Sequence, residues 1–146
     1  MATIKGYTDL EQSKKLAEFL PLESADMYWK NGVSDKYIQC FTPFVIDSTD
    51  VDYDYDVPCW SLVALIKLLP SEFTERDEYS ETTYKIDIRK YALTDDVDVY
   101  QIAYGNYHWY EDGSHSWSDM VNSGQREELI DVCYEMILKL HELNLL

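Results

Sequence analysis

The chain has 146 residues, of which 28 are Asp or Glu and only 12 are Lys or Arg, so its formal net charge is −16. A charge of this sign and size disfavours direct contact with nucleic acid or with an anionic membrane surface. Hydrophobic residues make up 46% and aromatic residues 14% of the chain, unlike the composition of an acidic disordered protein. We therefore expect one folded domain over residues 1–146, with a protein partner, in particular a basic one.

The sequence predicts neither a membrane span nor secretion. The longest apolar run, Leu62–Leu69, is interrupted by Lys67 and is far shorter than the roughly 18 residues that a span requires. The N-terminus lacks the apolar core of a signal peptide. Cys40, Cys59 and Cys133 are odd in number and scattered, unlike a disulfide framework. These features predict a cytoplasmic protein.

Three elements are expected in the N-terminal part of the chain. A capping-box pattern at 8–11 precedes apolar residues at helical spacing, and Pro21 ends the helix that this pattern predicts. A short helical turn is expected over 24–29. Residues 37–42 are rich in aromatic and branched side chains, which predicts a strand.

The central part of the chain is expected to hold a helix and a hairpin. Pro58 is placed in the first turn of an apolar helix that ends before Pro70. Residues 71–81 are polar and acidic, which predicts a loop. Alternating side chains over 82–93 indicate a strand, and 97–104 is the expected return strand of a hairpin.

The last predicted element is also the longest. Apolar residues recur at helical spacing over 125–143, and Ser123 is the expected N-terminal cap. Residues 106–110 are expected to extend the sheet, and 112–113 is a turn signal. The order of helices, strand, helix, strands and helix predicts an α+β fold, in which a small antiparallel sheet of three to four strands packs against helices, with a long C-terminal helix.

Alternating carboxylates form the first candidate site. Asp50, Asp52, Asp54 and Asp56 offer the oxygen ligands that Ca²⁺ or Mg²⁺ prefers. A Ca²⁺-binding loop of the EF-hand type, however, requires Gly at its sixth position, and a loop that starts at Asp52 has Val57 there. A solvated acidic loop is the simpler interpretation, so no metal and no other cofactor is predicted.

A stretch rich in aromatic residues forms the second candidate site. Exposed aromatic side chains with polar neighbours are typical of recognition surfaces, and Tyr107, Trp109, Tyr110 and Trp117 would form such a surface here. The alternative is that these rings pack on the sheet as part of the core.

No catalytic pattern is found, and no catalytic residue is predicted. His108, Glu111 and His115 have the residue types of a metal site, but their spacing matches no metal motif. Cys59 lies at the expected start of a helix, which favours a thiolate, yet the sequence places no base beside it. A small buried residue is the simpler interpretation of Cys59. Phosphate-binding glycine loops, nucleophile elbows and zinc-protease motifs are all absent from the sequence.

At segments 11–16, 25–28, 58–65 and 133–136, the chain resembles a family of small uncharacterised proteins of bacteriophages, prophages and mobile elements from gut Bacteroidetes. The likeness covers both ends and the central helix but not residues 72–117. The resemblance implies a phage-like genetic setting, and it carries over no catalytic or binding residue.

These observations lead to three hypotheses of function. The first is a non-enzymatic protein-interaction module, suggested by the acidic composition and the many Tyr and Trp residues. The second is an inhibitor that mimics nucleic acid and occupies a basic host protein. The third is a metal-dependent enzyme that uses the acidic loop at 50–56. A homodimer that buries its own aromatic surface is a further alternative.

Overall fold

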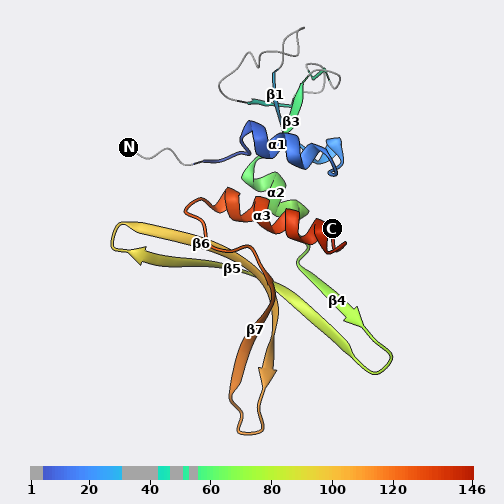
Figure 1. The fold of residues 1–146 in the computed structure, drawn as a ribbon, viewed down its shortest axis with the longest axis vertical. Coiled ribbons are helices and arrows are strands. Elements are labelled where there is room, and N and C mark those ends of the chain that lie inside the picture. The colour runs from blue at the N-terminus through green and yellow to red at the C-terminus, as the bar shows by residue number, and fades with distance from the viewer. Residues whose placement is uncertain (1–4, 31–42, 47–50, 53–55) are drawn as a thin grey trace. The chain divides into compact units, whose positions relative to one another are not determined.

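The computed structural model describes residues 5–30, 43–46, 51–52 and 56–146 (Figure 1). By its internal contacts the chain forms two compact units, Met1–Leu68 and Leu69–Leu146. Three α-helices and two antiparallel sheets, of three and four strands, are found in the described ranges, so the predicted α+β class with a C-terminal helix is confirmed. The expectation of a single domain stays a prediction, and the strand expected over 37–42 falls outside the described ranges. None of the described helices is long and apolar enough to cross a membrane.

The first helix, α1 (Leu10–Ala17), begins slightly later than its predicted capping pattern. Asp9, not Thr8, is the N-terminal cap. The Asp9 carboxylate accepts a hydrogen bond from the backbone N–H of Gln12 at 2.8 Å, and the Gln12 side chain accepts one from the N–H of Asp9 at 3.1 Å. A reciprocal capping box therefore exists, and it leaves Thr8 available for the interior.

Residues Met27–Trp29 form a strand, β1, so the helical turn predicted over 24–29 is wrong. A single 3₁₀ turn, η1 (Leu22–Ser24), ends before this strand. β1 is the central strand of a three-stranded sheet, in which β2 (Phe44–Val45) and β3 (Val57–Cys59) both pair with it antiparallel. Two ladders of backbone hydrogen bonds and the aromatic residues of the segment outweigh its weak helical signal.

The short helix α2 (Leu62–Leu68) begins later than predicted because Pro58 belongs to β3. Ser61 lies just before the helix, and its hydroxyl accepts a hydrogen bond from the backbone N–H of Ala64 at 3.2 Å. The Asp26 carboxylate accepts from the Ser61 backbone N–H at 2.8 Å and from the Ser61 hydroxyl. The start of α2 is thus tied to the segment that leads into β1.

Buried hydroxyl groups connect the elements of the N-terminal unit. The Thr8 hydroxyl accepts from the backbone N–H of Trp60 at 3.1 Å and lies 2.7 Å from the Ser13 hydroxyl. The Ser13 hydroxyl also accepts from the Trp29 indole at 3.2 Å, and the Cys59 thiol lies 3.4 Å from the Thr8 carbonyl oxygen. Both hydroxyl residues are 0% exposed. The network satisfies polar groups from α1, β1 and β3 at once.

Four strands form the antiparallel sheet of the C-terminal unit. β4 (Glu72–Arg76), β5 (Glu81–Thr94), β6 (Val97–Trp109) and β7 (His115–Asn122) lie side by side in chain order. The hairpin predicted from the alternating side chains is found in β5 and β6. β6 is longer than the return strand predicted over 97–104, because it continues into residues 106–109, which the sequence predicts as an extension of the sheet.

The segment 71–81, predicted as a loop, contains β4 and a tight turn. The Phe73 ring packs against Tyr84 of β5 and Tyr104 of β6, with ring centroids 5.4 and 5.0 Å apart. In the turn, the Asp77 carboxylate accepts backbone hydrogen bonds from the residues that follow it. The Phe73 anchor, this turn and cross-strand pairs such as Arg76 with Glu81 at 2.8 Å hold the segment as a strand, although it lacks apolar alternation.

The C-terminal helix, α3 (Leu129–Glu142), packs one apolar face against β6. Its fully buried residues are Ile130, Val132, Cys133, Met136, Ile137 and Leu140. The helix begins later than predicted, because Ser123 is not its cap. The Ser123 hydroxyl instead accepts from the backbone N–H of Ile102 at 2.9 Å and donates to the Gly124 carbonyl at 2.7 Å.

β5 and β6 exchange partners along their length, so the sheet divides into three hairpin arms. β5 pairs with β4 over 81–85 and with β6 over 85–94. β6 then pairs with β7 over 103–109. We call these two-stranded regions the β4–β5, β5–β6 and β6–β7 arms, and Figure 1 shows that they run out in different directions.

We expect the substitution Thr8→Val to destabilise the N-terminal unit by about 1–3 kcal/mol, because it keeps the shape of the side chain but leaves buried hydrogen-bonding groups without a partner. Thr8→Ser is the matched control. It keeps the hydroxyl and loses one methyl, at a cost of about 0.8 kcal/mol. Urea unfolding followed by tryptophan fluorescence measures both, and a valine variant as stable as the serine variant would contradict the role of the network.

Candidate functional site

The four predicted interaction residues all lie on the β6–β7 arm. Tyr107 and Trp109 come from β6, Tyr110 directly follows it, and Trp117 comes from β7. Trp109 is 71% exposed, Tyr110 is 56% and Tyr107 is 55% exposed. The alternative prediction, in which these rings are part of the core, does not describe the three exposed residues. We call these four residues, together with His115, the aromatic surface.

The register of the two strands brings the rings together. Tyr107 lies opposite Trp117 and Trp109 lies opposite His115. The ring centroids of Tyr107 and Trp117 are 5.1 Å apart, and those of Trp109 and His115 are 4.7 Å apart. Tyr107 also meets His115 edge to face at 5.2 Å. These rings form one continuous row on a single face of the arm, as side chains at alternating positions do.

The base of this row depends on Gly105. A Cβ atom at this position would lie 2.2 Å from the carbonyl oxygen of Ser118 and 2.9 Å from the Trp117 ring. Both approaches are shorter than real Cβ contacts allow. Close approach to a neighbouring backbone and ring therefore requires glycine here. A bulge in β7 adjoins this point, since the register shifts between Tyr104 and Gly105.

Trp117 is also held by a charged group from β5. Its indole N–H donates to Asp119 at 2.6 Å, and the same carboxylate accepts two hydrogen bonds from Arg89, at 2.8 and 3.2 Å. Arg89 also donates to Asp87 at 2.7 Å, and its guanidinium lies 5.8 Å from the Trp117 ring centroid. The bidentate pair, the indole bond and the cation–π contact fix Trp117 from one side.

The ion pair shifts the pKa of both partners. Hydrogen bonding to Arg89 is the largest cause that lowers the pKa of Asp119, and burial opposes it. Hydrogen bonding to Asp119 raises the pKa of Arg89. Both groups are therefore charged at neutral pH, and the carboxylate remains an acceptor for the Trp117 indole.

The far end of the arm is closed by a turn. The backbone N–H of Tyr110 donates to the Ser114 carbonyl at 2.9 Å, and the Tyr110 hydroxyl lies 3.0 Å from the Ser116 hydroxyl. The Asp112 carboxylate accepts from the backbone N–H of Ser114 at 2.8 Å, and hydrogen bonds from Ser114 lower the pKa of Asp112. This confirms the turn predicted at 112–113, with Gly113 at φ 83°.

The acidic segment is described only in part. Asp50 and Asp54 lie outside the described ranges. The Asp56 side chain is 0% exposed, and its carboxylate accepts from the backbone N–H of Asp52 at 2.9 Å and lies 3.4 Å from the Lys30 ammonium. Asp56 thus has a structural role between neighbouring segments.

Among the candidates that lie in the described ranges, there is neither a metal centre nor a reactive thiol. In the ranges that the structure describes, no three His, Cys, Asp or Glu side chains are grouped as a metal ion would require. Cys59 and Cys133 are both free and fully buried. Burial raises the pKa of Cys59, and it raises that of Cys133 to about 12, so neither is a thiolate at neutral pH.

Sequence reasoning found the exposed rings but missed the residues that hold them. Arg89 and Asp119 are thirty positions apart and form their pair only through the strand order. Gly105 stands alone, without a turn partner in the sequence. The one available signal was an isolated Gly inside a strand pattern, which often marks a bulge or a close backbone approach.

Comparisons with protein-family models, curated proteins and solved structures give no match to the chain.

We expect Gly105→Ala to destabilise the protein by about 1–3 kcal/mol, because the new methyl group forces apart the β7 backbone and the Trp117 ring. The Trp117 indole N–H resonance should also shift as its bond to Asp119 lengthens. Gly6→Ala is the control, because nothing lies within 4 Å of a Cβ there. Urea unfolding and NMR measure both effects, and an alanine variant that behaves like the Gly6 control would contradict the close approach.

The Arg89–Asp119 pair predicts a defined pH dependence of stability. Because the folded pKa of Asp119 is lowered, its contribution is complete above the unfolded pKa of about 4 and is lost as the pH falls through the lower folded value. We expect the stability difference between the wild type and Asp119→Asn to be constant from about pH 7 to 5 and to shrink below about pH 4. Urea unfolding at each pH measures this difference, and a difference that grows on acidification would contradict the prediction.

Proposed function

We propose that this chain is a non-enzymatic protein-interaction module and that the aromatic surface is where its partner binds. The observation that carries this proposal is the combination of exposure and order in one row of rings. Trp109 and Tyr107 are each more than half exposed, and ring contacts with His115 and Trp117 fix them. Tyr110, which is also more than half exposed, lies at the end of the arm and is held by Ser116. The partner is expected in the cytoplasm, the compartment that the sequence predicts.

Exposed aromatic rings of this kind suit binding energetically. Trp and Tyr each bury roughly 150–250 Å² when covered, and they dominate the binding energy of many interfaces. Rings that are already held in place lose little side-chain freedom on binding, so more of the burial energy appears as affinity. The contacts of Trp117 with Tyr107, Asp119 and Arg89 supply this order in the free protein.

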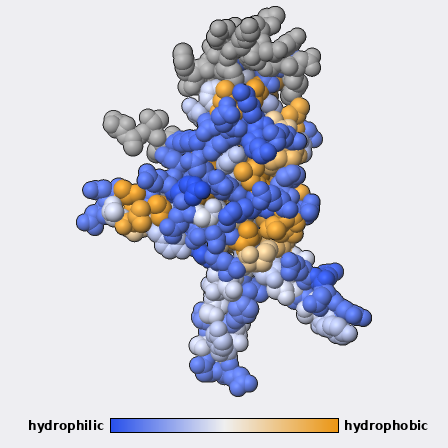
Figure 2. Space-filling view, in the orientation of Figure 1, coloured by the Kyte–Doolittle hydropathy of each residue, from blue (hydrophilic) through white to orange (hydrophobic). Residues whose placement is uncertain are grey.

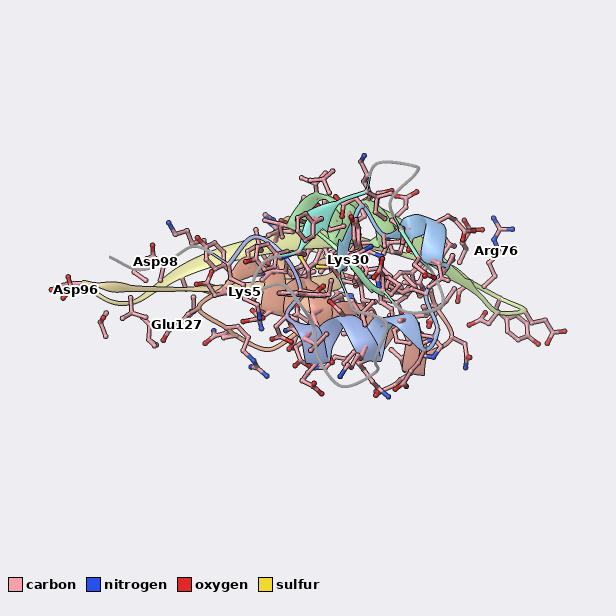
Figure 3. The ribbon with its side chains drawn as sticks, turned by 90° about the horizontal axis from the view of Figure 1, so that it is seen from above. Lys5, Lys30, Arg76, Asp96, Asp98 and Glu127 are labelled. Atoms are coloured by element: carbon pink, nitrogen blue, oxygen red, sulfur yellow. The ribbon has the colours of Figure 1, made fainter. Side chains whose placement is uncertain are left out.

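The charge of the chain favours a basic partner. Exposed carboxylates lie near the ends of the arms, and Figure 3 shows Asp96 at the far end of the β5–β6 arm with Asp98 further back along it. Of these two, Asp98 is paired with Lys90 at 2.9 Å. A net charge of −16 accelerates encounter with a positively charged surface, and this acceleration weakens as salt rises.

Mimicry of nucleic acid would depend on charge, whereas binding through the aromatic surface depends on apolar contact. Part of the affinity should therefore persist at high salt. Complete loss of binding at high salt, with no effect of substitutions in the aromatic surface, would favour mimicry instead.

We expect Trp109→Ala to weaken binding of the protein partner at least about tenfold, because it removes the most exposed Trp or Tyr ring of the aromatic surface. The immobilised protein is exposed to a lysate of a gut Bacteroidetes species, the setting that the resemblance implies, and the retained proteins are quantified. The affinity of the purified partner is then measured by calorimetry at low and high salt.

The matched control for this experiment is Leu93→Ala. Leu93 is 63% exposed on the β5–β6 arm, whose end carries an apolar patch in Figure 2, and it lies outside the aromatic surface. We expect the control variant to retain the same partner with unchanged affinity. A partner that is retained equally by the Trp109 and Leu93 variants would place the binding site elsewhere and overturn the proposal.

A further inference from the structure

The sheet of the C-terminal unit forks where β5 and β6 separate. The pair Lys85 and Gly105 is the last one between these strands. In the part of the sheet that the structure describes, β5 pairs beyond this point only with β4, and β6 pairs over 106–109 only with β7. Figure 1 shows the β4–β5 and β6–β7 arms running apart from this region.

A cavity of about 430 Å³ lies at the fork. Its lining comes from three strands: Thr82 and Tyr84 of β5, Asn106 and His108 of β6, and Ser118, Asp119 and Met120 of β7. Most residues that line the cavity are polar, whereas Tyr107 and Trp109 of the aromatic surface lie at the alternate positions of β6. The fork therefore offers two different surroundings on the two faces of the same strand edge.

The backbone of β6 directs hydrogen-bonding groups into this fork. The Ile102 carbonyl accepts from the N–H of Ser123, and the N–H of Tyr110 donates to the Ser114 carbonyl. The backbone N–H and C=O groups of the even-numbered β6 residues are therefore directed toward β7. Backbone groups alternate in direction along a strand. Tyr107 and Trp109, which lie beyond the last β5 pair, therefore direct their N–H and C=O groups toward the fork.

Residues 106–109 carry none of the side chains that usually block strand pairing at a sheet edge. Natural sheet edges are commonly blocked by Pro, by Lys or by inward-pointing charges. Residues 106–109 are Asn, Tyr, His and Trp, which include no proline, lysine or carboxylate. An open edge with aromatic side chains is a template for an added strand.

We propose that an extended, basic segment of a partner protein adds to β6 at the fork as an antiparallel strand. This inference rests on the proposed function and specifies its partner and its mode of binding. The backbone of the added segment would pair with that of Tyr107 and Trp109. Its side chains would lie alternately beside the aromatic surface and beside Asn106 and His108, so a segment of alternating apolar and basic residues fits best.

Charge selects this occupant over a second copy of the chain. Residues 69–146 carry 17 Asp and Glu and only six Lys and Arg. Two copies would bring this excess of negative charge together at one edge, which opposes pairing. A segment with Lys or Arg on its polar face brings the opposite charge to the same place.

The test uses an eight-residue peptide of alternating valine and lysine with blocked ends, and the full-length protein. In the antiparallel arrangement, the valines lie beside the aromatic surface and their N–H groups face β6. We expect N-methylation of all valines to weaken binding at least tenfold and N-methylation of all lysines to leave it unchanged. Replacement of lysine by glutamate should also weaken binding at least tenfold. The reverse N-methylation pattern would indicate parallel addition and would overturn the antiparallel arrangement. Equal binding of the two methylated peptides, or no binding of the parent peptide, would overturn strand addition altogether.

Amide hydrogen exchange distinguishes this inference from the proposed function. In the free protein, we expect the amides of Tyr107 and Trp109 to exchange faster than those of Asn106 and His108, which face β7. The peptide, or a natural partner, should then protect Tyr107 and Trp109. A partner that is sensitive to Trp109→Ala but leaves both amides unprotected would keep the proposed function and overturn strand addition. Amides already protected in the free protein would mean that the edge is occupied, and would also overturn it.

Discussion

The missing side chain at Gly105 is the constraint on which the C-terminal unit depends. At this residue β6 ends its pairing with β5 and continues beside β7, with a bulge adjacent. The Ser118 carbonyl and the Trp117 ring occupy the space that any Cβ would need. The tight packing of Trp117 on β6 and the separation of the arms therefore begin at the same residue.

Order and exposure are divided between the two ends of the aromatic surface. At one end, Trp117 is held by Asp119 and by the guanidinium of Arg89. Its ring in turn restricts the Tyr107 ring through an edge-to-face contact. Trp109 at the other end is 71% exposed and touches only another ring, His115, among the ring contacts that the structure describes. A surface built in this way is rigid at its base and open where a partner would arrive.

The sequence predicts individual helices and strands of this fold better than it predicts which strands pair and which distant residues meet. Alternation over 82–93 and apolar spacing near the C-terminus are local, so the β5–β6 hairpin and α3 could be expected. β4 has no such pattern. Its aromatic anchor is a single residue, Phe73, whose ring packs on Tyr84 and Tyr104. The aromatic residues of the candidate site were visible as a cluster, but the Arg89–Asp119 pair and the fork depend on where each strand changes partner, which no local pattern records.

The large negative charge of the chain explains how the edge of β6 can stay open without pairing with a second copy. An unprotected edge exposes a protein to pairing with copies of itself, and natural sheets usually block it with a residue on the edge. Here the excess of carboxylates over the unit as a whole opposes approach of a second copy, without a charge or proline on residues 106–109. Repulsion of this kind leaves the backbone groups of the edge accessible, and it does not oppose a strand of opposite charge. The backbone groups of the edge would form the same hydrogen bonds with a second copy of the chain or with a basic strand. The acidic composition then has a role in specificity, because it repels the copy and attracts the basic strand.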